Sequence, residues 1–188
     1  MAPLVSIVVG LNLVVPQVDP RDDSGKPITV RLNPYVLVIE AGQREAASVG
    51  SYSVRVFNDE PELYGDFVDG QILRRDGSIL RVWLANLDHS LAARHLLVWT
   101  QSAGSGSFGK VDVFRVDRKG KLRREAISEL PTVKGYAGHD RYFTKHGVLF
   151  REFPVGDGGV VKEFASAPRI RFVLDLKSSI WVGVDECD

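Results

Sequence analysis

The sequence predicts an all-β protein, a single antiparallel β-sandwich or barrel-like domain with little helix. Apolar and polar residues alternate with a period of two in several segments, which buries one face of a strand and leaves the other in water. Turn-forming residues separate roughly nine or ten such segments at even spacing, as in sandwiches and barrels. No long linker interrupts the 188 residues, so we expect residues 1–188 to form one domain.

The first apolar segment, residues 4–15, is most simply a buried strand. It is shorter than the ~20 apolar residues that a membrane-spanning helix needs. No lysine or arginine precedes it, whereas a secretory signal carries a basic residue there. We therefore expect no membrane insertion.

Strand candidates follow along the rest of the chain. Alternation is clearest in residues 51–57, 110–116 and 169–176. More uniformly apolar candidates are residues 35–40, 79–84, 95–100, 148–153 and 180–184. Several of these are too apolar to be edge strands.

Turn signals lie between the strands. Residues 75–77 (Arg-Asp-Gly) predict a tight hairpin turn, and residues 118–121 predict another. Residues 22–25 predict a loop, and residues 156–159 predict a flexible stretch. One short helical turn is expected at residues 126–130, where the next residue is proline.

Composition excludes several classes of protein. Lys plus Arg and Asp plus Glu both number 24, so the net charge is zero and the basic excess of a nucleic-acid-binding domain is missing. The only cysteine, Cys187, can form neither an intrachain disulfide nor a thiolate zinc site. His89, His95 and His146 lack the helical spacing of zinc enzymes. We expect no metal and no cofactor.

A glycine-rich string at residues 102–111 is the most informative motif, because Gly104, Gly106 and Gly109 spell G-x-G-x-x-G. A dinucleotide-binding fingerprint needs a helix after the glycines, but residues 110–117 have strand periodicity. A kinase glycine loop fits locally, but the other kinase motifs are missing. Neither nucleotide-binding interpretation is favoured.

The third interpretation is a protruding hairpin loop that binds a partner protein. Its glycines let the backbone approach another surface closely, and its serine hydroxyls can donate and accept hydrogen bonds. Phe108 offers an aromatic anchor of the kind found in binding hot spots. The alternative is a long flexible turn with no binding role.

An enzymatic role is not favoured by the same residues. Ser105 lies in Gly-Ser-Gly rather than in the G-x-S-x-G elbow of serine hydrolases, and no helix follows. His139 and Asp140 are neighbours, and neighbouring residues on a strand point to opposite faces. They more simply bond to the backbone and pin a loop. We expect no catalytic residues and no enzyme.

Three segments, residues 96–109, 135–140 and 149–154, resemble in the same order the family of periplasmic inhibitors of invertebrate-type lysozyme. Their sequences are Leu-Leu-Val-Trp-Thr-Gln-Ser-Ala-Gly-Ser-Gly-Ser-Phe-Gly, Gly-Tyr-Ala-Gly-His-Asp and Leu-Phe-Arg-Glu-Phe-Pro. The resemblance covers about residues 71–155. It leaves residues 1–70 and 156–188 as divergent extensions.

The resemblance implies an antiparallel β fold in the bacterial periplasm, often as a homodimer. It also implies that a loop with a Ser-Gly-x-Tyr motif enters the active-site cleft of the lysozyme. The motif falls on Ser105, Gly106 and Phe108, so phenylalanine stands where the family has tyrosine. The missing hydroxyl removes one hydrogen bond, worth ~0.5–1.5 kcal/mol, but the ring can still stack.

The expected mechanism is occlusion of the lysozyme cleft. Glycosidases place two carboxyl groups astride the scissile bond, and the Ser105 hydroxyl and glycine N–H groups can hydrogen-bond them. The expected partner-binding residues are Gly104, Ser105, Gly106, Ser107, Phe108, Gly109, Tyr136, His139 and Asp140. A second interpretation is a non-enzymatic β-sandwich interaction module of the bacterial envelope whose partner is not a lysozyme.

Overall fold

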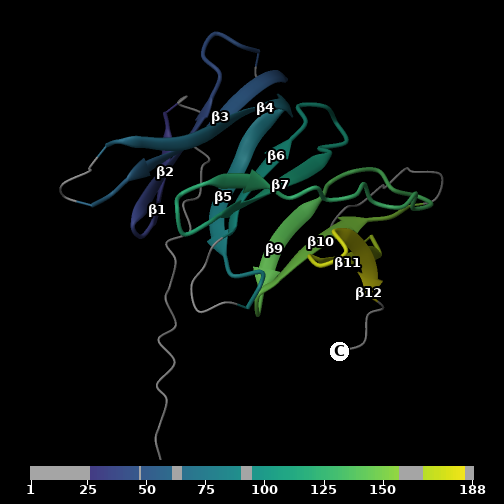
Figure 1. Cartoon of the computed structure of the whole chain (residues 1–188). Coiled ribbons are helices and arrows are strands. Elements are labelled where there is room, and N and C mark those ends of the chain that lie inside the picture. Colours follow the sequence, from purple (N-terminus) through teal and green to yellow (C-terminus); the bar gives the residue numbers. More distant parts are fainter. Residues whose placement is uncertain (1–25, 47, 61–64, 90–94, 157–166, 185–188) are drawn as a thin grey trace, which may run out of the picture.

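Three four-stranded antiparallel sheets make up the computed structural model (Figure 1), which describes residues 26–46, 48–60, 65–89, 95–156 and 167–184. The first sheet holds β1 (Ile28–Leu32), β2 (Tyr35–Ala41), β3 (Val49–Asn58) and β4 (Phe67–Asp76). The second holds β5 (Ser78–Ala85), β6 (His95–Gln101), β7 (Gly109–Val116) and β8 (Leu122–Arg124). The third holds β9 (Arg141–Lys145), β10 (Val148–Pro154), β11 (Arg169–Asp175) and β12 (Ile180–Val184). The predicted all-β class is confirmed.

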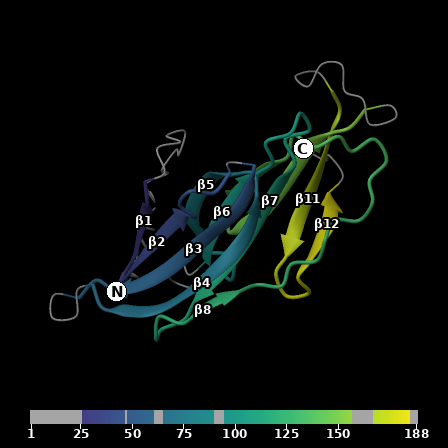
Figure 2. The ribbon, with the colours of Figure 1, turned by 90° about the horizontal axis from the view of Figure 1, so that it is seen from above.

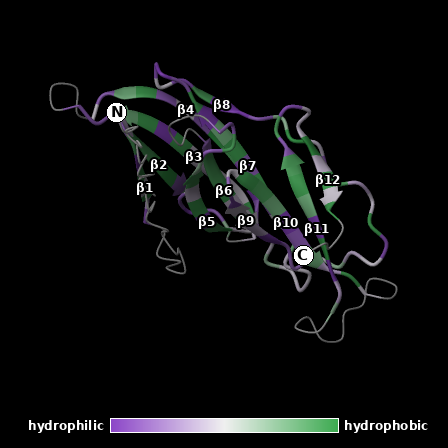
Figure 3. Ribbon diagram, turned by 90° about the horizontal axis from the view of Figure 1, so that it is seen from below, coloured by the Kyte–Doolittle hydropathy of each residue, from purple (hydrophilic) through white to green (hydrophobic). Residues whose placement is uncertain are grey.

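The second sheet lies between the other two and is buried on both faces. One face packs against the first sheet in a core that includes Leu37, Val54, Leu96, Val98 and Phe114. The other face packs against the third sheet in a core that includes Trp83, Leu97, Val113, Leu149 and Phe153. In Figure 3 hydrophobic residues follow the strands of all three sheets. The sandwich therefore has three layers.

The three layers explain why β6 is apolar on both faces. Leu96 and Val98 face the first core, while Leu97 and Trp99 face the second. A strand with one wet face would alternate, but a strand between two cores reads as a continuous apolar run. The prediction that several of the uniformly apolar segments are not edge strands is confirmed for β2, β6 and β10, whereas β5 and β12 lie at sheet edges.

The predicted hairpin turn at residues 75–77 is wrong. Gly77 joins β4 of the first sheet to β5 of the second, and these two strands do not pair. Gly77 has φ +89°, and a Cβ there would lie 1.7 Å from the Gln101 carbonyl oxygen. Arg75 fixes the corner, because its Nε donates to the Ser51 carbonyl at 2.9 Å. The Asp-Gly signal marks a reversal of the chain but does not say which sheet the next strand joins.

The turn at residues 118–121 is confirmed as the hairpin between β7 and β8. The Asp117 N–H donates to the Lys121 carbonyl at 3.0 Å, and Gly120 has φ +74°. A left-handed backbone is the conformation that glycine adopts without a steric cost.

The short helical turn expected at residues 126–130 is also wrong. The segment after β8 forms no helical turn and runs across to the third sheet (Figure 2). The Ser128 N–H donates to the Ser179 carbonyl at 2.8 Å, and Ile127 and Leu130 pack against the second core. These contacts with another part of the chain replace the local hydrogen bonds of a helix.

Some predictions lie outside the described residues: the strand at residues 4–15, the loop at 22–25, most of the stretch at 156–159, and Cys187. Within the described part of the chain, no helix has the length and apolarity needed to cross a membrane.

His95 makes the stability of the fold depend on pH. Its side chain is fully buried, and burial lowers its pKa against the opposing effects of Asp88 and Glu125. The unfolded chain, with a histidine pKa near 6.5, therefore binds more protons than the folded chain. The stability that the neutral His95 side chain contributes is fully present above about pH 6.5 and decreases as the pH falls below that value.

We expect the urea midpoint of unfolding to be lower at pH 5.5 than at pH 7.5. The substitution His95→Gln removes the titrating group and should reduce this difference. The same difference in the variant as in the parent protein would contradict the assignment to His95.

Candidate functional site

The β6–β7 loop, residues 102–108, is a closed hairpin with an exposed tip. At its base the Ser102 N–H donates to the Phe108 carbonyl at 2.9 Å, and the Phe108 N–H donates to Ser102 Oγ at 2.9 Å. Across the loop the Ser107 N–H donates to the Gly104 carbonyl at 3.0 Å. Gly104 and Ser105 are exposed. The tip is thus accessible, whereas the base is fixed by hydrogen bonds.

Phe108 stands half out of the surface beside this tip. Its side chain is 49% exposed, and its ring meets the Tyr136 ring edge-on with centroids 5.6 Å apart. A Cβ on Gly106 would lie 2.3 Å from the Phe108 ring, so this ring position requires a glycine at residue 106. Phe108 is therefore held in one place while much of its ring remains accessible.

The segment 135–140 packs directly against the loop, so two of the motifs meet in space. The His139 N–H donates to the Gly106 carbonyl at 2.8 Å. Gly138 has φ +85°, and a Cβ there would lie 1.8 Å from the same carbonyl oxygen. This close approach of two backbones is possible only because residue 138 is glycine.

Asp140 points inward and joins the loop to the third sheet. Its Oδ2 accepts hydrogen bonds from the Gly109 N–H and the Tyr136 hydroxyl, both at 2.7 Å. Its Oδ1 accepts one from Arg151 Nε at 2.7 Å. Burial raises the pKa of Tyr136, and its hydrogen bond to Asp140 raises that pKa further. The prediction that Asp140 bonds to the backbone and pins the loop agrees with this geometry.

The structure brings all nine predicted binding residues to one end of the second sheet, where some are exposed and others are buried. Gly104, Ser105 and Phe108 are exposed, whereas Asp140 is buried. Arg151 and Tyr142 belong to the same group, but sequence reasoning missed them. The signal for Arg151 was the presence of two charges, Arg151 and Glu152, inside the otherwise apolar run 148–153, because a buried charge requires a partner.

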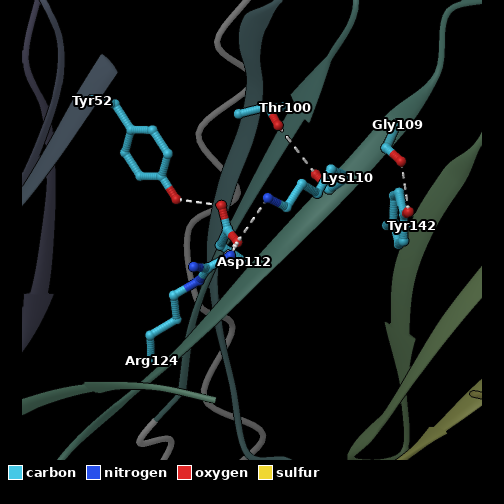
Figure 4. A network of polar contacts seen from close by, with 7 residues as sticks. All are labelled: Tyr52, Thr100, Gly109, Lys110, Asp112, Arg124 and Tyr142. Carbon is cyan, nitrogen blue, oxygen red and sulfur yellow. Dashed lines mark hydrogen bonds and ion pairs between the residues drawn. The ribbon is translucent and has the colours of Figure 1, made fainter. Parts of the chain in front are cut away.

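A second polar network fastens β7 beneath the loop (Figure 4). Asp112 is 3% exposed and accepts hydrogen bonds from the Tyr52 hydroxyl and from Arg124 Nη2, both at 2.6 Å. At the start of β7 the Tyr142 hydroxyl donates to the Gly109 carbonyl at 2.9 Å. These bonds tie β7 to the first sheet, to β8 and to the third sheet. In the described segments, no group of three or more His, Cys, Asp or Glu residues is placed to hold a metal ion.

Fold and site together define a three-layered β-sandwich protein that presents a glycine-rich loop on a fixed base. The family model for periplasmic lysozyme inhibitors of I-type lysozyme matches residues 25–145, well over half of the chain. The chain belongs to this family of periplasmic lysozyme inhibitors. Its members are inhibitors and not enzymes, which confirms the expected function class and the periplasmic location.

Two solved structures are similar to this chain. The I-type lysozyme inhibitor of Aeromonas hydrophila is 33% identical with a TM-score of 0.50, over 54% of this chain and 86% of that one. The Aeromonas hydrophila inhibitor in complex with Meretrix lusoria lysozyme is 33% identical with a TM-score of 0.48, over 53% of this chain and 81% of that one. No curated protein matches. The family match includes the first sheet and the segment 135–140 but ends before residues 149–154.

Proposed function

We propose that this protein inhibits an invertebrate-type lysozyme by inserting the loop of residues 104–109 into the active-site cleft. The observation that carries the proposal is the exposed tip at Gly104 and Ser105, mounted beside a half-exposed Phe108 on a base fixed by hydrogen bonds. Family membership supports the inhibitory activity, and the shape of the loop supports the route of insertion.

The chemistry of the tip suits a cleft that contains two carboxyl groups. Residues 102–109 include no charged side chain, so the loop brings no carboxylate that would repel those of the enzyme. The Ser105 hydroxyl and the backbone N–H groups of the tip can donate to them, and such charge-assisted bonds are about twice as strong as neutral ones. Because the loop is already closed, binding orders few additional groups, which limits the entropic cost.

The test is a titration of cell-wall lysis by lysozymes of the i, g and c types with this protein. We expect inhibition of the i-type enzyme at a molar ratio near one. No inhibition of any type at micromolar concentration would overturn the proposal. It would favour the second interpretation, an envelope interaction module with a partner that is not a lysozyme.

A substitution at Phe108 is expected to strengthen inhibition, whereas most substitutions in a binding site weaken it. Phe108→Tyr restores the tyrosine of the family motif and adds a hydroxyl on a ring that is 49% exposed. One net hydrogen bond of ~0.5–1.5 kcal/mol corresponds to roughly two- to tenfold tighter inhibition. The measurement is the inhibition constant against an i-type lysozyme.

The control for that variant is Phe67→Tyr on β4, another exposed phenylalanine outside the loop. It should leave inhibition unchanged. Unchanged or weaker inhibition by Phe108→Tyr would show that no acceptor in the cleft faces this ring.

We further propose that a second copy of the chain pairs with β12, giving the homodimer that the family resemblance implied. β12 lies at the edge of the third sheet, and Ile180, Val182 and Val184 are 43%, 43% and 38% exposed. Natural edge strands are commonly protected by charges or proline, but β12 contains neither. Antiparallel pairing about Val182 would set Ile180 opposite Val184 of the other copy.

Sedimentation equilibrium over a range of concentrations tests this pairing. We expect a dimer, and we expect Val182→Glu to give a monomer. A parent protein that stays monomeric at all concentrations would contradict the pairing.

A further inference from the structure

We propose that Arg151, Asp140 and Tyr136 form a positioning cluster that holds the β6–β7 loop in its binding conformation, so that the third sheet takes part in inhibition without touching the lysozyme. This inference rests on the proposed function. The three side chains are joined to one another by hydrogen bonds and are joined to the loop through its backbone.

A short chain of contacts joins the loop to β10. Gly109 follows Phe108 directly, and its N–H donates to Asp140 Oδ2 at 2.7 Å. Asp140 Oδ1 is held by Arg151 Nε at 2.7 Å. Only two hydrogen bonds therefore separate the loop backbone from β10. A shift of the Arg151 guanidinium would move the carboxylate that fixes the C-terminal end of the loop.

The ion pair between Asp140 and Arg151 is buried. The Asp140 and Arg151 side chains are 0% and 11% exposed. Loss of one partner of such a pair leaves the other as an uncompensated buried charge, which must find a new partner or draw in water. The Asp140–Arg151 pair therefore has one favourable arrangement. Because Gly109 donates to Asp140, this arrangement also fixes the base of the loop.

The Arg151 guanidinium is held in place by the aromatic rings around it. It lies 5.5 Å from the Tyr136 ring centroid, and 5.6 Å from those of Tyr142 and Phe153. Its Nη2 also donates to the Tyr136 hydroxyl at 2.9 Å. Cation–π contacts and this hydrogen bond fix both its position and its orientation. Tyr136 in turn supports the Phe108 ring, so the cluster holds both the backbone and the aromatic anchor.

The neighbouring residue provides a matched control. Glu152 points to the opposite face of the third sheet, where Arg171 Nη2 donates to it at 2.9 Å. Among the described residues, no hydrogen bond or ion pair connects Glu152 or Arg171 to the β6–β7 loop. Arg171→Met therefore breaks an ion pair of the same sheet without disturbing the loop.

The experiment compares Arg151→Met, Tyr136→Phe and Arg171→Met in the full-length protein. The readouts are the inhibition constant, the melting temperature and the amide hydrogen exchange of Gly109. We expect Arg151→Met to weaken inhibition at least tenfold and to speed exchange at Gly109. Tyr136→Phe, which removes only a hydroxyl, should do both to a smaller extent. Arg171→Met should do neither.

A double substitution separates positioning from a general loss of stability. If Arg151 acts through the loop, Arg151→Met should weaken inhibition much less when Phe108→Ala is already present than when it is made alone. Folded Arg151→Met protein with unchanged inhibition and unchanged exchange at Gly109 would overturn the proposal. If Arg151→Met does not fold, Tyr136→Phe decides by the same two readouts. If the parent protein inhibits no lysozyme, the proposed function fails, but exchange at Gly109 still shows whether the cluster holds the loop.

Discussion

Alanine at Ser105 or Phe108 is expected to weaken lysozyme inhibition by about tenfold to a hundredfold, while the melting temperature changes little. In the proposed complex, Ser105→Ala removes a donor to an ionised carboxyl group, a bond worth ~1.5–3 kcal/mol. If Phe108 is the proposed aromatic anchor, Phe108→Ala removes a hot-spot residue, and such residues cost about 2 kcal/mol or more when truncated. Ser105 is exposed, and substitutions at exposed positions usually change stability by less than about 0.5 kcal/mol. Phe108 is half-exposed and loses one ring contact with Tyr136, worth about 0.5–1.5 kcal/mol.

The measurements are inhibition constants against an i-type lysozyme and thermal unfolding of each variant. Phe67→Ala serves as the control, because Phe67 is 62% exposed and lies on β4 in the first sheet. It should leave both readouts nearly unchanged. If Ser105→Ala and Phe108→Ala instead lower the melting temperature strongly and leave inhibition intact, the loop is structural and the proposed route of inhibition is wrong.

Sequence periodicity predicted eight of the twelve strands in the described residues, missing β1, β4, β8 and β9, and it did not predict the layers. The run Leu96, Leu97 and Val98 indicated an interior strand, because each of its faces is apolar. Whether one or two further sheets cover those faces depends on contacts with residues far along the chain, such as Phe153 and Phe172. The same limit explains Gly77, where local sequence predicted a reversal but the next strand joined a different sheet.

The candidate site was predictable to the extent that its motifs are local. The glycines of residues 104–109 indicated a loop, and Asp140 was expected to bond to a backbone. That its carboxylate would accept from Gly109, 31 residues away, required the fold. The partnership with Arg151 could not be predicted either, because eleven residues and the β9–β10 turn separate the two side chains.

Gly138→Ala is expected to destabilise the protein and to weaken inhibition together. Gly138 has φ +85°, a conformation that costs a non-glycine residue about 1–2 kcal/mol. In addition, its Cβ would lie 1.8 Å from the Gly106 carbonyl oxygen, so one of the two backbones must move. We expect a total loss of roughly 2–4 kcal/mol, with a fall in melting temperature of about 4–16 °C. Because Gly106 is in the loop, inhibition should weaken about tenfold or more at temperatures where the variant is folded.

Gly65→Ala separates the cost of the left-handed backbone from the cost of the steric clash with Gly106. Gly65 also has φ +85°, but among the described residues no atom lies within 4 Å of its Cβ position. Its variant should show the backbone strain alone, with a smaller fall in melting temperature and unchanged inhibition. If Gly138→Ala and Gly65→Ala behave alike in both measurements, the close approach between Gly138 and Gly106 has no part in holding the loop. The loop would then depend on its own hydrogen bonds and on Asp140.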